Sequence, residues 1–128
     1  MARTVAVIGA STDRSKYGNK SVRAHIKAGF TVYPVNPKAE TIEGLPVYPD
    51  LGSVPDPVDR ITVYVPPRIG LALIEQIAAK KPKELWLNPG SESPELVARA
   101  EALGLHPIQA CSIVDVGEDP RLMDMGTS

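Results

Sequence analysis

Thr4-Val5-Ala6-Val7-Ile8-Gly9-Ala10-Ser11 is the stretch that decides the fold. Its first five residues are apolar or favour β-structure without alternating, which predicts a strand buried on both faces of a parallel sheet. Gly9 lets the backbone turn sharply and approach a ligand closely. A helix is expected to begin near residues 17–19, so its N-terminal N–H groups and positive dipole end should face the same crevice. The stretch therefore predicts that a small phosphate-bearing ligand binds at this turn.

The rest of the chain alternates between strand and helix patterns. Further strands are expected at residues 30–35, 61–65, 84–87 and 106–110, with a short extension at 42–47. Helices are expected at residues 21–28, 69–81 and 94–103, the last with Ser93 as N-cap. The connector 50–57 has room for at most one helical turn, and the tail from Val114 has no clear period. This alternation predicts an α/β fold: a three-layer, Rossmann-like, open and mainly parallel sheet with helices on both faces, formed by residues 1–128 as a single domain.

Two features of the helix at residues 21–28 have specific consequences. Val22 and Ile26 are four residues apart, which predicts that they share the apolar face of the helix. His25 lies among polar neighbours and is expected to be in solvent. Cys111 is interpreted as a buried structural thiol rather than a reactive one.

Composition restricts the class of protein. Hydrophobic residues make up 43% of the 128 residues and charged residues 23%, which is typical of a soluble globular domain. The net charge of −1 argues against a general nucleic-acid or membrane-surface binder. The single cysteine and the absence of a signal-peptide or bilayer-spanning run favour a cytoplasmic protein. The 13 prolines and the few Asn and Gln residues hint at a thermophilic source.

The candidate binding residues follow the strands. The carboxyl ends of parallel strands meet at one edge of a sheet, where ligands bind. Four strand exits should converge there: Gly9-Ala10-Ser11, Val35-Asn36-Pro37-Lys38, Val65-Pro66-Pro67 and Asn88-Pro89-Gly90. Arg14 and Lys16, in the loop after the first strand, fit a phosphate region by their charge.

The glycine pattern restricts the nucleotide. The dinucleotide fingerprint G-x-G-x-x-G is absent, because residues 9–14 contain one glycine and Gly18 comes too late for the pattern. An NAD site also needs an acidic residue after the second strand, where this chain has Asn36-Pro37-Lys38. The sequence therefore disfavours NAD and is compatible with NADP or a ribose-3′-phosphate ligand. It also contains no ATP-binding P-loop.

Four motifs together resemble those of the CoA-binding domain family: Val7-Ile8-Gly9-Ala10-Ser11, Tyr33-Pro34-Val35-Asn36-Pro37-Lys38, Val63-Tyr64-Val65-Pro66 and Leu85-Trp86-Leu87-Asn88-Pro89-Gly90. These are small stand-alone proteins similar to the N-terminal Rossmann-like domain of the succinyl-CoA synthetase alpha subunit. The resemblance implies that coenzyme A, or an acyl-CoA, binds at the carboxyl ends of the strands. It places Gly9, Ala10 and Ser11 on the phosphates and Lys38 at the phosphorylated ADP end. Adenine would lie beside Val35 and Pro37, with Val65 and Pro66 on the next wall and Asn88 and Gly90 along the pantetheine path.

The chain departs from the synthetase pattern at its end. It stops at Ser128, before the domain that carries the phosphorylated histidine, and neither His25 nor His106 lies in a matching motif. We therefore expect binding without catalysis by this chain alone. Two other readings stay open: a small NADP-dependent oxidoreductase, and a regulatory or assembly module of an acyl-CoA synthetase-like complex whose partner supplies the chemistry.

Overall fold

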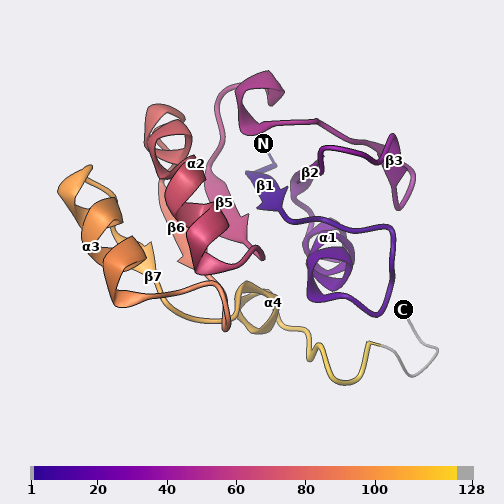
Figure 1. Cartoon of the computed structure of the whole chain (residues 1–128). Helices are drawn as coiled ribbons and strands as arrows, with labels where there is room; N and C mark the ends of the chain where they lie inside the picture. Colours follow the sequence, from indigo (N-terminus) through magenta and orange to yellow (C-terminus); the bar gives the residue numbers. More distant parts are fainter. Residues whose placement is uncertain (1, 124–128) are drawn as a thin grey trace.

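The computed structural model describes residues 2–123 and consists of a parallel sheet between helices (Figure 1). Five parallel strands occur in the order β2-β1-β5-β6-β7, with bounds β1 (Thr4–Ile8), β2 (Thr31–Val35), β5 (Arg60–Val63), β6 (Glu84–Leu87) and β7 (Pro107–Ile108). The helices are α1 (Tyr17–Lys27), α2 (Pro67–Ala79), α3 (Pro94–Ala102) and α4 (Ser112–Asp115). A separate hairpin of β3 (Thr41–Ile42) and β4 (Leu45–Pro46) precedes the 3-10 turn η1 (Leu51–Ser53). The predicted Rossmann-like α/β fold is confirmed.

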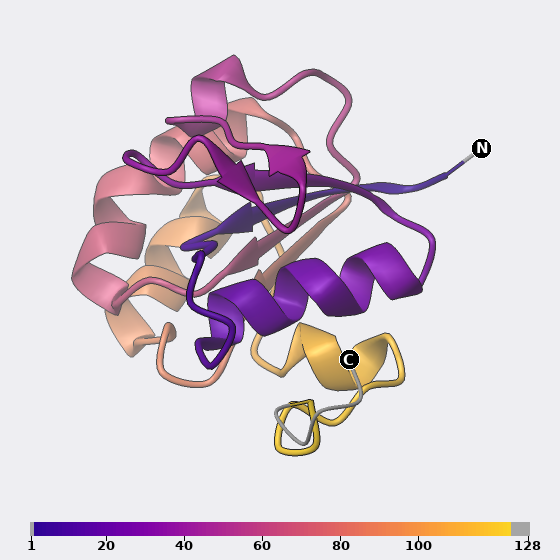
Figure 2. The same cartoon turned by 90° about the vertical axis from the view of Figure 1, so that its right-hand side faces the viewer.

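The central strand β1 is buried on both faces, as its sequence predicts. Val5 and Val7 pack with Val22 of α1 on one face, whereas Ala6 and Ile8 pack on the other face with residues of α2 and α3. Successive side chains of a strand point to opposite faces, so this one strand contributes to two cores. Figure 2 shows α1 along one face of the sheet, with α4 outside it, and α2 and α3 on the other side.

The strand order changes direction at β1, with β2 on one side of it and the later strands on the other. β1 pairs with β2 along one edge and with β5 along the other. The connection after β1 therefore leads to one side of the strand, and the connection after β2 returns to its other side. Such a switch point is where open α/β sheets bind ligands, outside the carboxyl ends of the strands. The exits of β1 and β5 are accordingly the place to look for a site.

Three elements after residue 60 differ from those expected. The strand expected at 61–65 ends at Val63, and that expected at 106–110 is reduced to Pro107–Ile108. The region around Val114, for which no structure was expected, contains α4. The backbone N–H of Ser112 at the start of α4 donates to the Asn88 side chain, at 2.9 Å. A contact between residues 24 positions apart leaves no local pattern in the sequence. Among residues 2–123, no helix combines the length and hydrophobicity that crossing a membrane requires.

The expected orientation of α1 was wrong. Val22 is buried, but Ile26 is 41% exposed, and His25, expected in solvent, is completely buried. The reason is that α1 lies between the sheet and α4, so its buried surface is wider than one apolar stripe. The His25 ring donates from Nδ1 to the Ser21 carbonyl at 2.8 Å, and its Nε2 accepts from Arg60 at 3.3 Å. Burial lowers the pKa of His25 to about 4.

Arg60 connects α4 to the amino end of the sheet. It is 3% exposed and lies between the rings of Phe30 and Trp86, 5.1 and 4.8 Å from their centres. Its guanidinium donates to Glu84 at 2.9 Å and to Asp115 of α4 at 2.8 Å. A buried charge needs such partners, because an unpaired ion in the interior is costly. This cluster therefore fixes the position of α4 from the end of the sheet opposite the strand exits.

Candidate functional site

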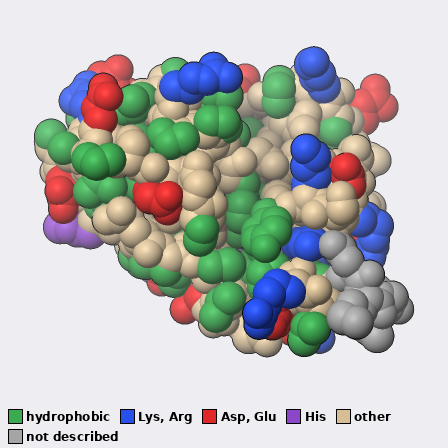
Figure 3. All heavy atoms as spheres, turned by 60° about the horizontal axis from the view of Figure 1, so that its bottom comes forward, with side chains coloured by type: hydrophobic (Ala, Val, Ile, Leu, Met, Phe, Trp, Pro, Cys, Tyr) green, Lys and Arg blue, Asp and Glu red, His purple; other side chains and the backbone are tan. Residues whose placement is uncertain are grey.

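Two adjoining cavities lie at the carboxyl edge of the sheet. The first has a volume of about 340 Å³ and the second about 260 Å³, and both are lined by Gly9 and Val65. These two residues follow β1 and β5, so the junction of the cavities is the switch point of the sheet. Figure 3, with the lower side of Figure 1 turned forward, shows hydrophobic side chains gathered in a hollow on this face. The arrangement offers an elongated ligand two connected compartments.

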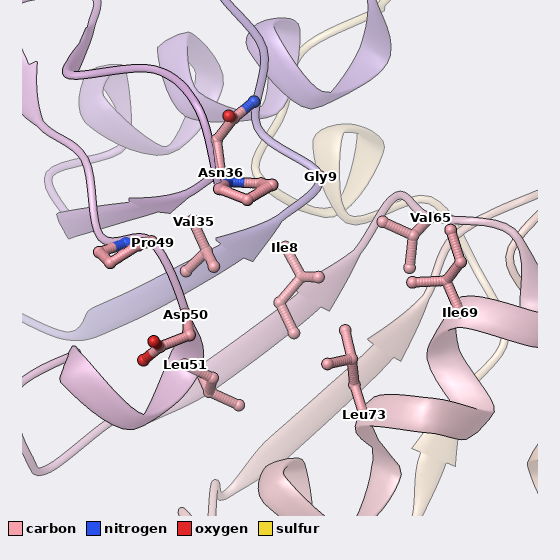
Figure 4. A pocket seen from close by; sticks show the side chains of 11 residues that line it. Ile8, Gly9, Val35, Asn36, Pro49, Asp50, Leu51, Val65, Ile69 and Leu73 are labelled. Atoms are coloured by element: carbon pink, nitrogen blue, oxygen red, sulfur yellow. The ribbon is translucent and has the colours of Figure 1, made fainter.

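The first cavity has an apolar interior. It is lined by Ile8, Gly9, Val35, Asn36, Pro37, Pro49, Asp50, Leu51, Val65, Ile69 and Leu73. Figure 4 shows the side chains of Asn36 and Asp50 directed away from its centre. Asn36 Nδ2 donates to the Ala10 carbonyl at 2.9 Å, and Asp50 accepts from the Ser53 N–H at 2.9 Å. Because both polar groups are used in the scaffold, the cavity presents aliphatic and proline surfaces, which suit a flat, weakly polar ring.

The second cavity contains the start of α1. It is lined by Gly9, Lys16, Tyr17, Gly18, Tyr64, Val65, Pro66, Pro89, Gly90 and Ser91. The N–H groups of Asn19 and Lys20 bond to the Lys16 carbonyl, so those of Tyr17 and Gly18 lack an intrahelical acceptor. They carry the positive end of the helix dipole toward the cavity. Burial raises the pKa of Tyr64, whose hydroxyl lies 2.9 Å from Ser112 Oγ. Tyr64 therefore stays neutral, and the fixed charge on this wall is positive.

Two glycines allow α1 to approach the exit of β1. Gly9 has φ +88°, and a Cβ there would lie 2.9 Å from the Tyr64 carbonyl oxygen. A Cβ on Gly18 would lie only 2.0 Å from the carbonyl oxygen of Gly9. Gly18 therefore does what the last glycine of a dinucleotide fingerprint does, which is to permit close packing of helix and strand. The spacing differs because residues 10–16 form a longer loop.

This longer loop is held by side chains from α1 and from the turn between β3 and β4. Asn19, buried in α1, donates to the Ser11 carbonyl at 2.9 Å and to Glu43 at 3.1 Å. Glu43, in the β3–β4 turn, also forms an ion pair with Arg14. Arg23 donates to the carbonyl of Arg14 at 2.7 Å. The guanidinium of Arg14, expected near the phosphates, is thus directed to the hairpin in this structure.

The structure brings most of the expected binding residues to the two cavities. Eight of them form cavity walls: Gly9, Lys16, Val35, Asn36, Pro37, Val65, Pro66 and Gly90. Ala10 is buried in the core cluster that contains Val22 of α1, and the Ser11 hydroxyl accepts the Asp13 N–H at 3.0 Å. Lys38 is exposed directly after Pro37. Among the described residues, neither Lys16 nor Lys38 has an ion-pair partner, so both ammonium groups are available to an anion.

Asn88 lies outside the cavity walls. It is 1% exposed, and its amide donates to Thr62 Oγ1 at 2.7 Å and to the Val63 carbonyl at 2.9 Å. Its oxygen accepts from the N–H and hydroxyl of Ser112, at 2.9 and 3.2 Å. All four hydrogen-bonding positions of the side chain are therefore occupied. Its place in the structure is to join β5, the exit of β6 and α4 behind the second cavity.

Several wall residues were not anticipated from the sequence. Asp50 and Leu51 were assigned to a connector, yet they close one side of the first cavity. Tyr17 and Gly18 were noted as a helix start but not as wall residues. The glycine at a helix start was the available signal for Gly18, whereas nothing local distinguishes Leu51 from a connector residue. In the described part of the chain, no group of three or more His, Cys, Asp or Glu side chains could hold a metal ion.

Comparison with known proteins identifies relatives among ADP-forming ligases. An acetate–CoA ligase [ADP-forming] I from Archaeoglobus fulgidus is 33% identical over 113 residues, covering 80% of this chain. The chain spans only 16% of the length of that ligase. A solved structure of a dinucleotide-forming acetyl-coenzyme A synthetase 1 from Ca. Korarchaeum cryptofilum, in complex with phosphate and ADP, has 33% identity and a TM-score of 0.73. The match covers 84% of this chain and 25% of the synthetase chain.

A small protein matches over nearly its full length. A conserved hypothetical protein from Pyrococcus furiosus is 35% identical with a TM-score of 0.80, over 88% of this chain and 98% of its own. The family model described as "CoA binding domain" matches residues 3–117, which include every wall residue of the two cavities. The chain belongs to the CoA-binding domain family.

Proposed function

We propose that this chain binds coenzyme A or an acyl-CoA at the carboxyl edge of its sheet and does not itself catalyse a reaction. One observation carries the proposal: an apolar cavity and a cavity containing a helix N-terminus meet at the switch point of the sheet, at Gly9 and Val65. Coenzyme A has an adenine ring, a pyrophosphate and a long pantetheine arm, which need an apolar slot, an anion site and a channel in that order. Family membership supports this assignment.

The adenine ring fits the first cavity. Val35 and Pro37 form one wall and Val65 the facing one, as the resemblance to the family implies, with Ile69 and Leu73 beside Val65 (Figure 4). Burial of apolar surface stabilises such a complex by about 25 cal/mol per Å² removed from water. The interior offers no charged group to bind a phosphate, so the phosphates must lie outside it.

The pyrophosphate fits the start of α1. Lys16, Tyr17 and Gly18 line the same cavity, and the N–H groups of Tyr17 and Gly18 have no intrahelical acceptor. One anion at a helix N-terminus gains about 0.3–1 kcal/mol from the dipole, and up to roughly 2 kcal/mol where partly buried. Micromolar affinity requires about 8 kcal/mol, so the phosphate contacts and the adenine slot must act together. The pantetheine arm would then continue past Pro66 and Gly90.

Melting temperatures with added ligand test the proposal. Coenzyme A at about 100 times its dissociation constant adds roughly 2.7 kcal/mol to the stability of the folded state, which raises the melting temperature of a domain of this size by about 10 °C. NAD should leave it unchanged. A shift with NADP but none with coenzyme A would favour the oxidoreductase reading and overturn ours.

The position of Lys38 gives a finer test of the bound orientation. Because Lys38 follows Pro37 at the rim of the adenine slot and is exposed, we assign its ammonium group to the 3′-phosphate. Lys38→Glu should weaken coenzyme A about tenfold and dephospho-CoA little, by isothermal titration calorimetry. Lys83→Glu is the matched control, since Lys83 is 81% exposed and precedes β6 at the amino end of the sheet. Equal losses for the two ligands would refute this orientation.

A second candidate function is a binding module of a larger synthetase-like assembly. The observation in its favour is that the related ligase is about six times as long as the part of it that this chain matches. A partner would then supply the chemistry to the bound thioester. Size-exclusion chromatography of the chain with a synthetase-like subunit from the same source, with and without coenzyme A, distinguishes a module from a protein that acts alone.

A further inference from the structure

A third cavity continues the series along the carboxyl edge. It has a volume of about 430 Å³ and is lined by Tyr17, Pro89, Cys111, Val114, Glu118, Asp119, Pro120 and Arg121. It shares Tyr17 and Pro89 with the second cavity, as the second shares Gly9 and Val65 with the first. The three cavities are therefore joined pairwise in one row. The third cavity is lined by residues of α4 and of the segment after it, which do not line the first two cavities.

The row matches the order of groups in a thioester of coenzyme A. With the adenine in the first cavity and the pyrophosphate at α1, the pantetheine arm passes through the second cavity. Its sulfur end then reaches the boundary formed by Tyr17 and Pro89. Whatever the sulfur carries must lie beyond that boundary, in the third cavity.

The walls of the third cavity favour an uncharged acyl group. Tyr17 and Val114 are 47% and 60% exposed, which is unusual for large apolar side chains and leaves surface that an acyl chain would cover. The charged wall residues are two acids and one base. Asp119 accepts two hydrogen bonds from the Arg121 guanidinium, at 3.0 and 2.8 Å, and Glu118 pairs with Lys27 at 3.3 Å. Because each of these charged side chains already has a partner, none is left to bind a carboxylate, and the exposed apolar surface favours an uncharged acyl group.

We propose that the third cavity is an acyl pocket, and that the chain binds a short, uncharged acyl-CoA in preference to free coenzyme A. This inference rests on the proposed function, because it needs the cofactor in the first two cavities. Each methylene buried there should tighten binding about fourfold. Butyryl-CoA, with two more methylenes, should therefore bind about fifteenfold more tightly than acetyl-CoA, and succinyl-CoA no more tightly than free coenzyme A.

Calorimetric titration with a wall variant tests the pocket. In Val114→Asp, butyryl-CoA should lose its advantage over coenzyme A, while the affinity for coenzyme A stays the same. Ile26→Asp is the matched control, since Ile26 is a helical, 41% exposed aliphatic residue outside all three cavities and should leave both affinities unchanged. Equal affinities for butyryl-CoA and coenzyme A in the unmodified protein would overturn the acyl pocket alone. Failure of both to bind would overturn the proposed function and the pocket with it.

Alkylation of Cys111 gives a second readout that does not depend on a variant. It is the single cysteine of the chain, lies half-buried, and lines the third cavity. Saturating butyryl-CoA should slow its modification by N-ethylmaleimide at least tenfold, followed by intact mass. 3′-Phospho-ADP, which lacks the arm, should raise the melting temperature without slowing the alkylation. If butyryl-CoA stabilises the protein and Cys111 reacts at its original rate, the acyl group lies elsewhere.

Discussion

Replacing Gly18 by alanine tests whether the start of α1 rests directly on the exit of β1. The added Cβ would lie 2.0 Å from the Gly9 carbonyl oxygen, whereas ordinary contacts begin near 3.4 Å. The helix start and the turn must therefore separate by about 1.4 Å, the difference between these two distances. The atom in the way belongs to the backbone of a buried strand exit, so it cannot rotate aside as a side chain would.

The cost follows from this geometry. Overpacking a closely packed site destabilises a protein by about 1–3 kcal/mol, and a backbone obstacle places this substitution at the upper end. The better helix propensity of alanine recovers at most about 1 kcal/mol. The net loss of roughly 2 kcal/mol should lower the melting temperature by about 5–10 °C. The affinity for coenzyme A should also fall at least tenfold, because the N–H groups of Tyr17 and Gly18 move with the helix.

Thermal unfolding by circular dichroism, with calorimetry for the ligand, measures both effects. Gly52→Ala is the control: Gly52 is exposed in η1, its φ is not positive, and its new Cβ would meet only Asp50 Oδ1 at 3.4 Å. It should melt within about 2 °C of the unmodified protein. If Gly18→Ala behaves like this control in both measurements, α1 does not rest against Gly9 and the anion site is incorrectly placed.

Two further predictions concern the buried polar groups. The pKa of His25 is about 4 in the folded protein and 6.5 in the unfolded chain, so the unfolded chain binds the proton first and the free energy of unfolding falls by about 3 kcal/mol as the pH drops from 6.5 to 4. Urea unfolding at pH 7 and pH 4.5 should show most of this loss in the native protein and not in His25→Gln. An equal loss in both proteins would assign it to other groups. Asn88→Ala removes the hydrogen-bond partner of the Ser112 N–H and of the Val63 carbonyl, which should lower the free energy of unfolding by about 3 kcal/mol, measured in urea, and speed hydrogen exchange in α4. Unchanged exchange in α4 would show that Asn88 does not hold that helix.

Local patterns predicted the framework of the site because their physical cause is local. The continuous apolar run of β1 favours burial on both faces of the sheet. The backbone after it adopts φ +88°, a conformation that favours glycine, and Gly9 occupies that position. Val35 ends β2, and Pro37, Val65 and Pro66 come within three residues of the end of a parallel strand, so a parallel sheet brings them to one edge. The same reasoning places Gly90, whereas Lys16 was expected near the phosphates from its charge; the structure puts both in the walls of the second cavity.

Contacts between distant segments explain the environments that sequence patterns did not predict. His25 looked like a solvent residue because its burial depends on α4, and Arg60 lies 35 residues away from it along the chain. Asn88 has the position of a binding residue, but its four hydrogen bonds reach β5 and α4. Arg14 has the charge of a phosphate contact, yet Glu43 from the hairpin turn binds it.

The sequence by itself determined the parallel sheet, the sharp turn after its central strand and the set of strand exits that line the candidate site, because backbone geometry and the burial of apolar runs act over a few residues. Only the tertiary structure decided that Gly18 supports the close approach of α1, that η1 closes the first cavity, and that α4 extends the row to a third. Those features are volumes and contacts between segments far apart in the chain, and they exist only once the layers have packed.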